Sequence, residues 1–439
     1  MSTHDLHRLT ASEALQLIRT DQISVEEYAR SLLKRVESRD SQVQAWAYLN
    51  PNLILSQARA LDKVPKEERG PLHGIAIGVK DIMYTKDMPT EHNSPLYKGS
   101  LIQVDASPVM TLRNSGALIF GKTTTTEFAS TTVGPQTSNP YNKGRTPGGS
   151  SSGSGAAVAD MQVPIALGTQ TGGSIIRPGS FNGILGYKPT WGAISREGVR
   201  MYSINLDTVG FYARSVQDLQ LLADVFRLQD DEIPKPFILP GATFALCKTE
   251  VWPEAGPGTI KAMERAAELL RAAGAETVEL DLPEDFNGMQ DLHRRISQGD
   301  GRAAFLGEYT TAKDKLDTFL VGQVENVSGI TRREYLEALD VVASLRPKID
   351  RIASRYAAIL TPSVPDEAPE GIESTGSAVF NAMWTALHIP VVNIPGFSGS
   401  SKLPIGLSLV APRYKDRYLL NVSEEISKVF GNGGWQSDL

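Results

Sequence analysis

The chain of 439 residues has a single cysteine, Cys247, and only six histidines. One cysteine cannot form a disulfide within the chain, so a reducing compartment is the default expectation. Cys247 lies in the apolar run 244–247, which is typical of a small buried side chain rather than a nucleophile. The sequence has neither an HExxH pattern nor paired cysteines. We therefore expect no zinc or other metal site and no cofactor.

Long apolar runs and an excess of basic residues are also missing. No apolar run approaches the roughly 20 residues that a membrane span needs. Residues 1–9 are polar and lack the apolar core of a secretory signal. The net charge of −6 argues against nucleic acid or an anionic membrane as a partner, because both attract a concentrated basic patch. We expect a cytoplasmic protein that acts on a small molecule.

Short apolar segments alternate with amphipathic ones, which indicates an α/β fold. The first 65 residues are expected to be helical, with Ser24 and Glu27 as a capping box. Thr331 and Glu334 are expected to cap another helix, and Gly274 to end one at 259–273. The Asp- and Pro-rich stretch 227–240 is expected to be a linker or a surface crossing. Strands are expected at 74–79, 117–120, 163–167, 183–185, 243–246, 277–282, 357–360, 387–394 and 405–410.

Two familiar patterns are present without the structural context they need. Residues 116–123 fit a phosphate-binding loop, but their apolar centre predicts a strand where exposed backbone should wrap phosphate. Residues 149–153 fit a nucleophile elbow centred on Ser151, but they follow a loop rather than a buried strand. An elbow also needs a histidine base. None stands out among His73, His92, His293 and His388, and we expect His293 on a solvated helix.

The segment 147–178 is dense in glycine and serine and is the most informative part of the chain. It contains two Gly-Gly-Ser sequences, which end at Ser150 and Ser174. Such turns bring backbone N–H groups close to a ligand, so they favour a hydroxyl nucleophile beside an oxyanion hole. Without a histidine, thiol or metal, a lysine with a lowered pKa can act as base. Lys80 follows the apolar run 74–79, although a surface lysine at a strand end is the alternative.

These segments together resemble the amidase signature family of serine amide hydrolases. The resemblance spans about residues 10 to 425. It implies a single α/β/α domain over 1–439, with a central mixed, many-stranded sheet covered by helices. Within it, 1–65 would be a helical segment packed on a catalytic core, 66–439. The matching residues are 78–81, 147–151, 168–174, 186–190, 206–210 and 384–386.

The family's Ser–cisSer–Lys triad maps onto Ser174 as nucleophile, Ser150 as bridging serine and Lys80 as base. The resemblance implies a cis Gly149–Ser150 peptide bond and an acyl-enzyme on Ser174. Ser151 and Ser154 are expected to hold the loop by hydrogen bonds. The oxyanion hole is expected from the backbone N–H groups of Thr171, Gly172, Gly173 and Ser174.

The sequence departs from the family pattern at two positions. Gln170 stands where many members have aspartate, and Arg177 follows Ser174 by three residues rather than two. This variant resembles the malonamidase-like branch, in which the arginine meets a substrate carboxylate. A structural arginine that binds loop carbonyls is the alternative. The expected substrate is therefore a small amide, possibly carboxylated.

Other interpretations of the same machinery stay open. The substrate could be an aryl amide, an ester or a carbamate. The chain could instead belong to a partner-dependent amidotransferase, against which its modest length and altered signature argue. A homodimer is also expected from the resemblance. Expected substrate-contacting residues are Arg177, Gly149, Thr126, Thr169, Met83, Tyr84, Phe128 and Phe380.

Overall fold

The computed structural model describes residues 5–439, so the first four residues of the polar N-terminal stretch and of the expected 1–439 domain lie outside it. Within residues 5–439, eleven strands form one sheet in the order β1-β3-β2-β4-β6-β5-β10-β11-β9-β7-β8. The strands are β1 (Trp46–Tyr48), β2 (Ala76–Lys80), β3 (Leu118–Thr123), β4 (Ile165–Gln170), β5 (Leu185–Lys188), β6 (Thr208–Ala213), β7 (Thr243–Leu246), β8 (Glu276–Glu279), β9 (Ala358–Pro362), β10 (Val391–Ser398) and β11 (Pro404–Val410).

The sheet is mixed, as predicted. Strand β2 runs parallel to β3 and β4, and β7 runs parallel to β8 and β9, whereas the other pairs are antiparallel. Because β2 and β4 are parallel neighbours, their carboxyl ends lie at the same edge of the sheet. That edge is where polar side chains from the two strands can meet.

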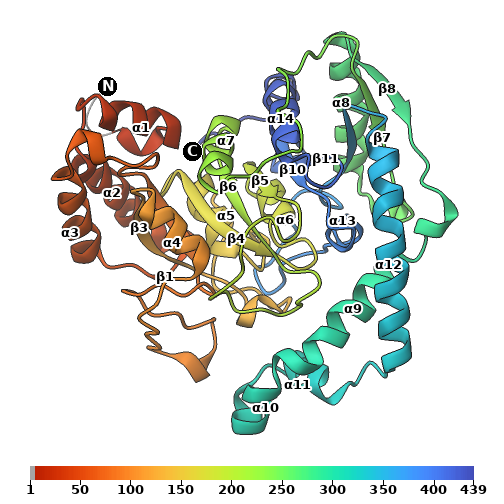
Figure 1. Ribbon diagram of the computed structural model, residues 1–439, viewed down its shortest axis with the longest axis horizontal. Helices are drawn as coiled ribbons and strands as arrows, with labels where there is room; N and C mark the ends of the chain where they lie inside the picture. Colours follow the sequence, from red (N-terminus) through yellow and green to blue (C-terminus); the bar gives the residue numbers. More distant parts are fainter. Residues whose placement is uncertain (1–4) are drawn as a thin grey trace.

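Helices cover both faces of the sheet. Helix α5 packs on β2, β3 and β4, α6 on β5, β10 and β11, and α7, α8 and α14 pack on β6, β10 and β11. Helices α1 to α3 lie at one end of the molecule, and α9 to α12 lie at the other (Figure 1). The helices are α1 (Ala11–Arg19), α2 (Val25–Val43), α3 (Pro51–Asp62), α4 (Ser107–Asn114), α5 (Ser152–Ala159), α6 (Ile176–Phe181), α7 (Val216–Val225), α8 (Pro257–Ala272), α9 (Met289–Ala304), α10 (Leu306–Ala312), α11 (Thr318–Glu325), α12 (Arg332–Ala353), α13 (Ala382–Ala386) and α14 (Asp416–Phe430).

Local sequence signals account for several helix starts. The predicted capping boxes are present at Ser24 and Thr331, and a third starts α1 at Thr10. Two strands were not predicted. The short β1 lies within the segment expected to be helical, and it pairs with β3 at the edge of the sheet. Strand β6 contains Gly210 and lies between β4 and β5, so its membership depends on neighbours that local propensity does not reveal.

The phosphate-loop pattern folds as its apolar centre predicts. Residues 118–123 form β3, and Lys122 is fully buried within it. A side chain at Gly121 would meet the Trp46 ring at 2.8 Å, so this backbone has no room to wrap a phosphate. The single cysteine, Cys247, is buried, and burial raises its pKa to about 12.

Candidate active site

Lys80 and Ser150 lie together at the edge where β2 and β4 end. Lys80 is the last residue of β2, and its side chain is fully buried. Its Nζ lies 2.7 Å from Ser150 Oγ and 2.8 Å from Thr169 Oγ1 on β4. The Gly149–Ser150 peptide bond is cis, as the resemblance implied. Thr169, expected as a substrate contact, is thus a direct partner of the lysine.

The surroundings of Lys80 differ from those of the other fully buried lysines. Lys122 on β3 forms an ion pair with Asp81 at 2.9 Å and also binds Thr90. Lys188 on β5 donates to two backbone carbonyls. Lys80 instead faces two hydroxyl groups, and no carboxylate lies within ion-pair distance of it in residues 5–439. Among these three lysines, Lys80 alone has hydroxyl partners without a carboxylate in direct contact.

Burial lowers the pKa of Lys80 well below its ordinary value of 10.5. The Asp207 carboxylate opposes this shift and the Arg177 guanidinium adds to it. Burial also raises the pKa of Asp207 to about 6. The lowered pKa favours a neutral amine at Lys80, which is the form that can accept a proton.

Ser174 lies between β4 and α6 and is 9% exposed. Its hydroxyl makes no hydrogen bond to any residue of the described range 5–439, Ser150 included. In ligand-free enzymes such contacts often close only when substrate binds. The backbone N–H groups of Gly172, Gly173 and Ser174 are also free of hydrogen bonds within this range. One short loop therefore presents a free hydroxyl and three free donors.

The carbonyl groups of the same loop are all occupied. The Gly173 carbonyl accepts from the Arg177 N–H at 2.9 Å, and the Ser174 carbonyl accepts from the Tyr212 hydroxyl at 2.9 Å. The Thr385 hydroxyl donates to the Gly172 carbonyl at 2.7 Å. His293 Nε2 lies 2.8 Å from the Thr171 carbonyl. We name residues 171–174 the oxyanion loop.

The position of His293 corrects a prediction. The charged neighbours Asp291, Arg294 and Arg295 indicated a solvated helix, and Arg294 is indeed exposed on α9. His293, however, is only partly exposed and lies against the oxyanion loop. A Cβ built on Gly172 would lie 3.7 Å from the ring. No local signal identifies this contact, because it joins segments 122 residues apart.

Gln170 and Asp207 hold the loop from outside. Gln170 Oε1 accepts from the N–H groups of Ile175 and Ile176 at 2.8 and 3.0 Å, and its Nε2 donates to Thr385 Oγ1 at 3.0 Å. Asp207 accepts a hydrogen bond of 2.5 Å from the Thr171 hydroxyl. The residue that departs from the family pattern is therefore fully used in bracing the nucleophile loop.

The contacts of Arg177 match the structural alternative rather than the carboxylate-binding one. The side chain is 5% exposed. Its Nη1 donates to the Gly376 carbonyl at 2.6 Å, and its Nη2 donates to the Gly149 carbonyl at 2.5 Å and to Thr375 Oγ1 at 3.1 Å. Nε alone has no partner. The two terminal nitrogens of the guanidinium, which would hold a carboxylate, instead bind backbone carbonyls, one of them directly before Ser150.

Ser151 and Ser154 hold the loop to β4, as predicted. Ser151 Oγ lies 3.2 Å from both the carbonyl and the N–H of Thr169. Ser154 Oγ donates to the Leu167 carbonyl at 2.7 Å. These bonds occupy the hydroxyl of the elbow-like pattern, so Ser151 lacks the free hydroxyl that a nucleophile needs.

Of the five remaining expected substrate contacts, Tyr84 and Phe128 share the neighbour His92, whereas Phe380 contacts another part of the fold. Phe128 packs in an aromatic cluster with His92 and Phe305, and Phe380 lines a small cavity beside Met383. Met83 and Thr126 are buried, and Tyr84 is partly exposed. The Met83 N–H donates to the Lys80 carbonyl at 3.0 Å, but within residues 5–439 no hydrogen bond or ring contact joins the side chains of these five residues to those of the triad. Their part in binding substrate stays a prediction.

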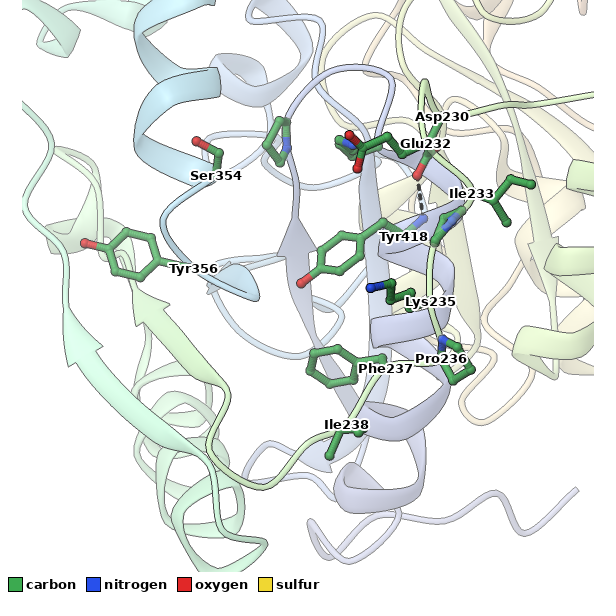
Figure 2. Close-up of a pocket in the computed structure, with 13 residues that line it drawn as sticks. Asp230, Glu232, Ile233, Lys235, Pro236, Phe237, Ile238, Ser354, Tyr356 and Tyr418 are labelled. Carbon is green, nitrogen blue, oxygen red and sulfur yellow. Dashed lines mark hydrogen bonds between the residues drawn. The ribbon is translucent and has the colours of Figure 1, made fainter.

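The pocket in Figure 2 lies elsewhere. It measures about 570 Å³, and its lining includes Asp230, residues 232–238, Tyr356 and Tyr418. Asp230 accepts from the N–H groups of Arg417 and Tyr418 at 2.9 Å each, so its carboxylate is used at the start of α14. None of the predicted site residues lines this pocket. The stretch is a surface crossing, as expected.

The amidase family model matches residues 27–420, which is most of the chain. The chain belongs to the amidase family. Enzymes of this family hydrolyse amide C–N bonds. No helix within residues 5–439 is both long and apolar enough to cross a membrane, and this part of the amidase contains no group of three or more side chains suited to hold a metal ion.

Known relatives of this amidase extend over its whole length. The glutamyl-tRNA(Gln) amidotransferase A subunit of Clostridium botulinum (strain Alaska E43 / Type E3) is 31% identical over 95% of this chain and 96% of the relative. Its counterpart from Carboxydothermus hydrogenoformans is 30% identical, over 95% and 96%. A crystal structure of an amidase superimposes with a TM-score of 0.87 at 27% identity, over 96% of this chain and 99% of that one. Chain length therefore does not argue against an amidotransferase component, contrary to the expectation from the sequence.

Proposed function

We propose that this protein cleaves an amide C–N bond through an acyl-enzyme on Ser174. The observation that carries the proposal is the contact between the buried Lys80 amine and Ser150, beside a loop whose N–H groups are free. A neutral amine, a hydroxyl relay and an unpaired hydroxyl are together what an alcohol nucleophile needs without histidine.

In the proposed reaction, substrate binding brings the Ser174 hydroxyl to Ser150. Lys80 accepts the Ser150 proton while Ser150 accepts the Ser174 proton, and Ser174 Oγ attacks the substrate carbonyl carbon. The N–H groups of the oxyanion loop stabilise the negative oxygen that forms. Lys80 then returns the proton through Ser150 to the leaving nitrogen, and the C–N bond breaks. Water attacks the acyl-enzyme by the same proton route and releases the acid.

We propose further that Arg177 positions Ser150 rather than binding a substrate carboxylate. Its bond to the Gly149 carbonyl fixes the main chain directly before Ser150. Its charge also helps to lower the pKa of Lys80. On this account, a small amide substrate needs no carboxylate, and aryl amides, esters and carbamates remain possible substrates of the same machinery.

The test is a hydrolysis panel of small aliphatic amides, carboxylated amides, aryl amides, esters and carbamates. Wild-type protein and Ser174→Ala are compared for release of ammonia, amine or alcohol. We expect turnover of at least one amide by the wild type and none by the variant. Equal turnover by both proteins would refute the assignment of Ser174.

A second candidate is the amide-cleaving component of an amidotransferase. Full-length similarity to the amidotransferase relatives favours it. The two candidates share the chemistry but differ in autonomy: a stand-alone hydrolase releases ammonia or amine unaided, whereas a partner-dependent component does not. The panel separates them, provided that Ser174 is also labelled with a fluorophosphonate. Labelling without turnover of any amide would favour the amidotransferase candidate. The expected homodimer and the absence of a nucleic-acid partner stay predictions.

A further inference from the structure

The oxyanion loop has a one-sided pattern of hydrogen bonds. Within residues 5–439 the carbonyls of Thr171, Gly172, Gly173 and Ser174 all have partners, whereas the N–H groups of the last three have none. The partner of the Gly173 carbonyl is the Arg177 N–H, which belongs to the first turn of α6, so this bond forms together with the helix. The partners of the first two carbonyls are side chains from distant helices, namely His293 on α9 and Thr385 on α13.

We propose that His293 and Thr385 are positioning residues that aim the N–H groups of Gly172 and Gly173 at the substrate oxyanion. The inference rests on the proposed function. A trans peptide group is planar, so its carbonyl and the following N–H point in opposite directions. Fixing the Thr171 carbonyl therefore aims the Gly172 N–H, and fixing the Gly172 carbonyl aims the Gly173 N–H.

The two glycines explain why the loop needs hydrogen bonds from other segments to fix its conformation. Gly172 and Gly173 have no Cβ, so their backbone can adopt many conformations and does not select one by itself. Space around the loop is restricted too, because a Cβ on Gly173 would lie 2.9 Å from Asn381 Nδ2 and 3.0 Å from Ala378 Cβ. A larger residue at position 173 is therefore not open as a way of fixing the loop. External hydrogen bonds to the carbonyls can fix the two peptide planes instead.

The direction of the hydrogen bonds at Thr385 depends on Gln170. Two backbone N–H groups, of Ile175 and Ile176, bind the same side-chain atom of Gln170, so that atom is the oxygen and the other is the NH₂ group. This NH₂ donates to Thr385 Oγ1, so the Thr385 proton is free for a carbonyl; the Gly172 carbonyl at 2.7 Å is closer than the Asn381 carbonyl at 3.2 Å. A carboxylate at position 170 would take that proton, because it can only accept. Gln170 thus keeps the Thr385 hydroxyl directed at the loop.

His293 acts on the neighbouring plane in the same way. A carbonyl only accepts, so the ring nitrogen 2.8 Å from Thr171 carries the hydrogen. The Thr171 side chain is held separately by Asp207. Together the two contacts fix both the side chain and the carbonyl of the first residue of the loop.

The experiment measures kcat and KM for His293→Ala, Thr385→Val and Gln170→Glu on an amide that the wild type hydrolyses. Removing an oxyanion donor costs about 10²- to 10³-fold in kcat, so misaiming one should cost about 10- to 100-fold. We expect KM to stay within about threefold, because the donors act mainly in the transition state. If no amide is turned over, the rate of Ser174 labelling by a fluorophosphonate replaces kcat, since that reaction also builds negative charge on oxygen.

Matched variants separate positioning from general disruption. Thr385→Ser and His293→Gln keep a donor and should restore much of the lost rate. Arg294→Ala changes the exposed neighbour on α9 and should leave kcat unchanged. Gln170→Glu and Thr385→Val remove the same hydrogen bond, so the double variant should be no slower than the slower single variant.

The outcomes are decisive in both directions. If Ser174→Ala is inactive while His293→Ala and Thr385→Val keep kcat within twofold, the positioning roles are wrong and the proposed function stands. If Ser174→Ala remains active, the proposed function itself fails. His293→Ala or Thr385→Val could fail to fold, which circular dichroism would reveal. The nearly isosteric Gln170→Glu then tests the role of Thr385. For His293, the comparison of His293→Gln with His293→Leu then decides. Full activity of Gln170→Glu, or equal rates of His293→Gln and His293→Leu, would overturn the respective role.

Discussion

Lys80→Met removes the proposed base while keeping an unbranched side chain in the buried position. General-base assistance contributes about 10²- to 10⁴-fold in rate. At about 1.4 kcal/mol for each tenfold change, this is about 3 to 5 kcal/mol of activation free energy. With the ordinary pKa of 10.5, only about 0.1% of Lys80 would be neutral at about pH 7.5. The lowered pKa increases the neutral fraction of Lys80, so we expect the wild-type rate to depend on the burial of this side chain.

The same burial has a consequence for stability that can be measured separately. Between the lowered pKa of Lys80 and 10.5, the unfolded chain binds a proton that the folded chain does not. The free energy of unfolding of the wild type therefore falls as pH drops through this window, with Lys80 as one contributor. Lys80→Met lacks this contribution. The difference in Tm between variant and wild type should move in favour of the variant as pH falls.

Lys122→Met is the matched control, because it removes the other buried lysine of this pair of strands. Its loss leaves the buried Asp81 without a cation, which typically costs about 3–5 kcal/mol of stability. We expect a large fall in Tm but a kcat per folded molecule within a few-fold of the wild type. The assay combines initial rates across pH with thermal unfolding of all three proteins. The assignment of Lys80 would be refuted if the rate of Lys80→Met were within threefold of the wild type. It would also be refuted if the difference in Tm between Lys80→Met and the wild type did not change with pH.

Other predictions follow from the site. Asp207 raises the pKa of Lys80, and Arg177 lowers it. Asp207→Asn should therefore move the acid limb of the pH–kcat profile to lower pH, and Arg177→Met should move it to higher pH. If both variants moved the limb in the same direction, the electrostatic account would be wrong. Arg177→Met should also slow carboxylated and neutral amides equally, and a selective loss on carboxylated amides, measured as kcat/KM, would restore the carboxylate-binding role. Ser150→Ala should lose about 10²-fold or more in kcat with little change in Tm, and a near-normal rate would exclude the hydroxyl relay.

The alternation of apolar and amphipathic segments predicted the mixed sheet and most of its strands, and the family resemblance implied the meeting of Lys80 with Ser150. The position of Lys80 has a simple cause: an apolar run that ends in lysine delivers the amine at a strand end, and β4 is a parallel neighbour that ends at the same edge. Ser151 and Ser154 were also predictable, because a loop so close to a strand needs its backbone groups satisfied.

The errors fall where distant segments decide the outcome. His293 was expected in solvent because its sequence neighbours are charged, yet packing of α9 turns one face of the helix toward the oxyanion loop. For Arg177 the sequence left two roles open, binding a substrate carboxylate or binding loop carbonyls, because a guanidinium suits both; the folded chain brings two backbone carbonyls within reach of it. Position along the chain carries no information about either contact.

The bonds that shape the oxyanion loop join pairs of residues that lie 38, 122 and 213 positions apart in the chain. Residues 171, 172 and 174 are held by residues 293, 385 and 212, respectively. During synthesis, a ribosome that has released only the first three hundred residues has not yet supplied the Thr385 hydroxyl. Hydrolytic competence should consequently appear last in folding, after the strands around Lys80 have paired, and recovery of enzymatic rate after denaturation would report on completion of the carboxyl-terminal half.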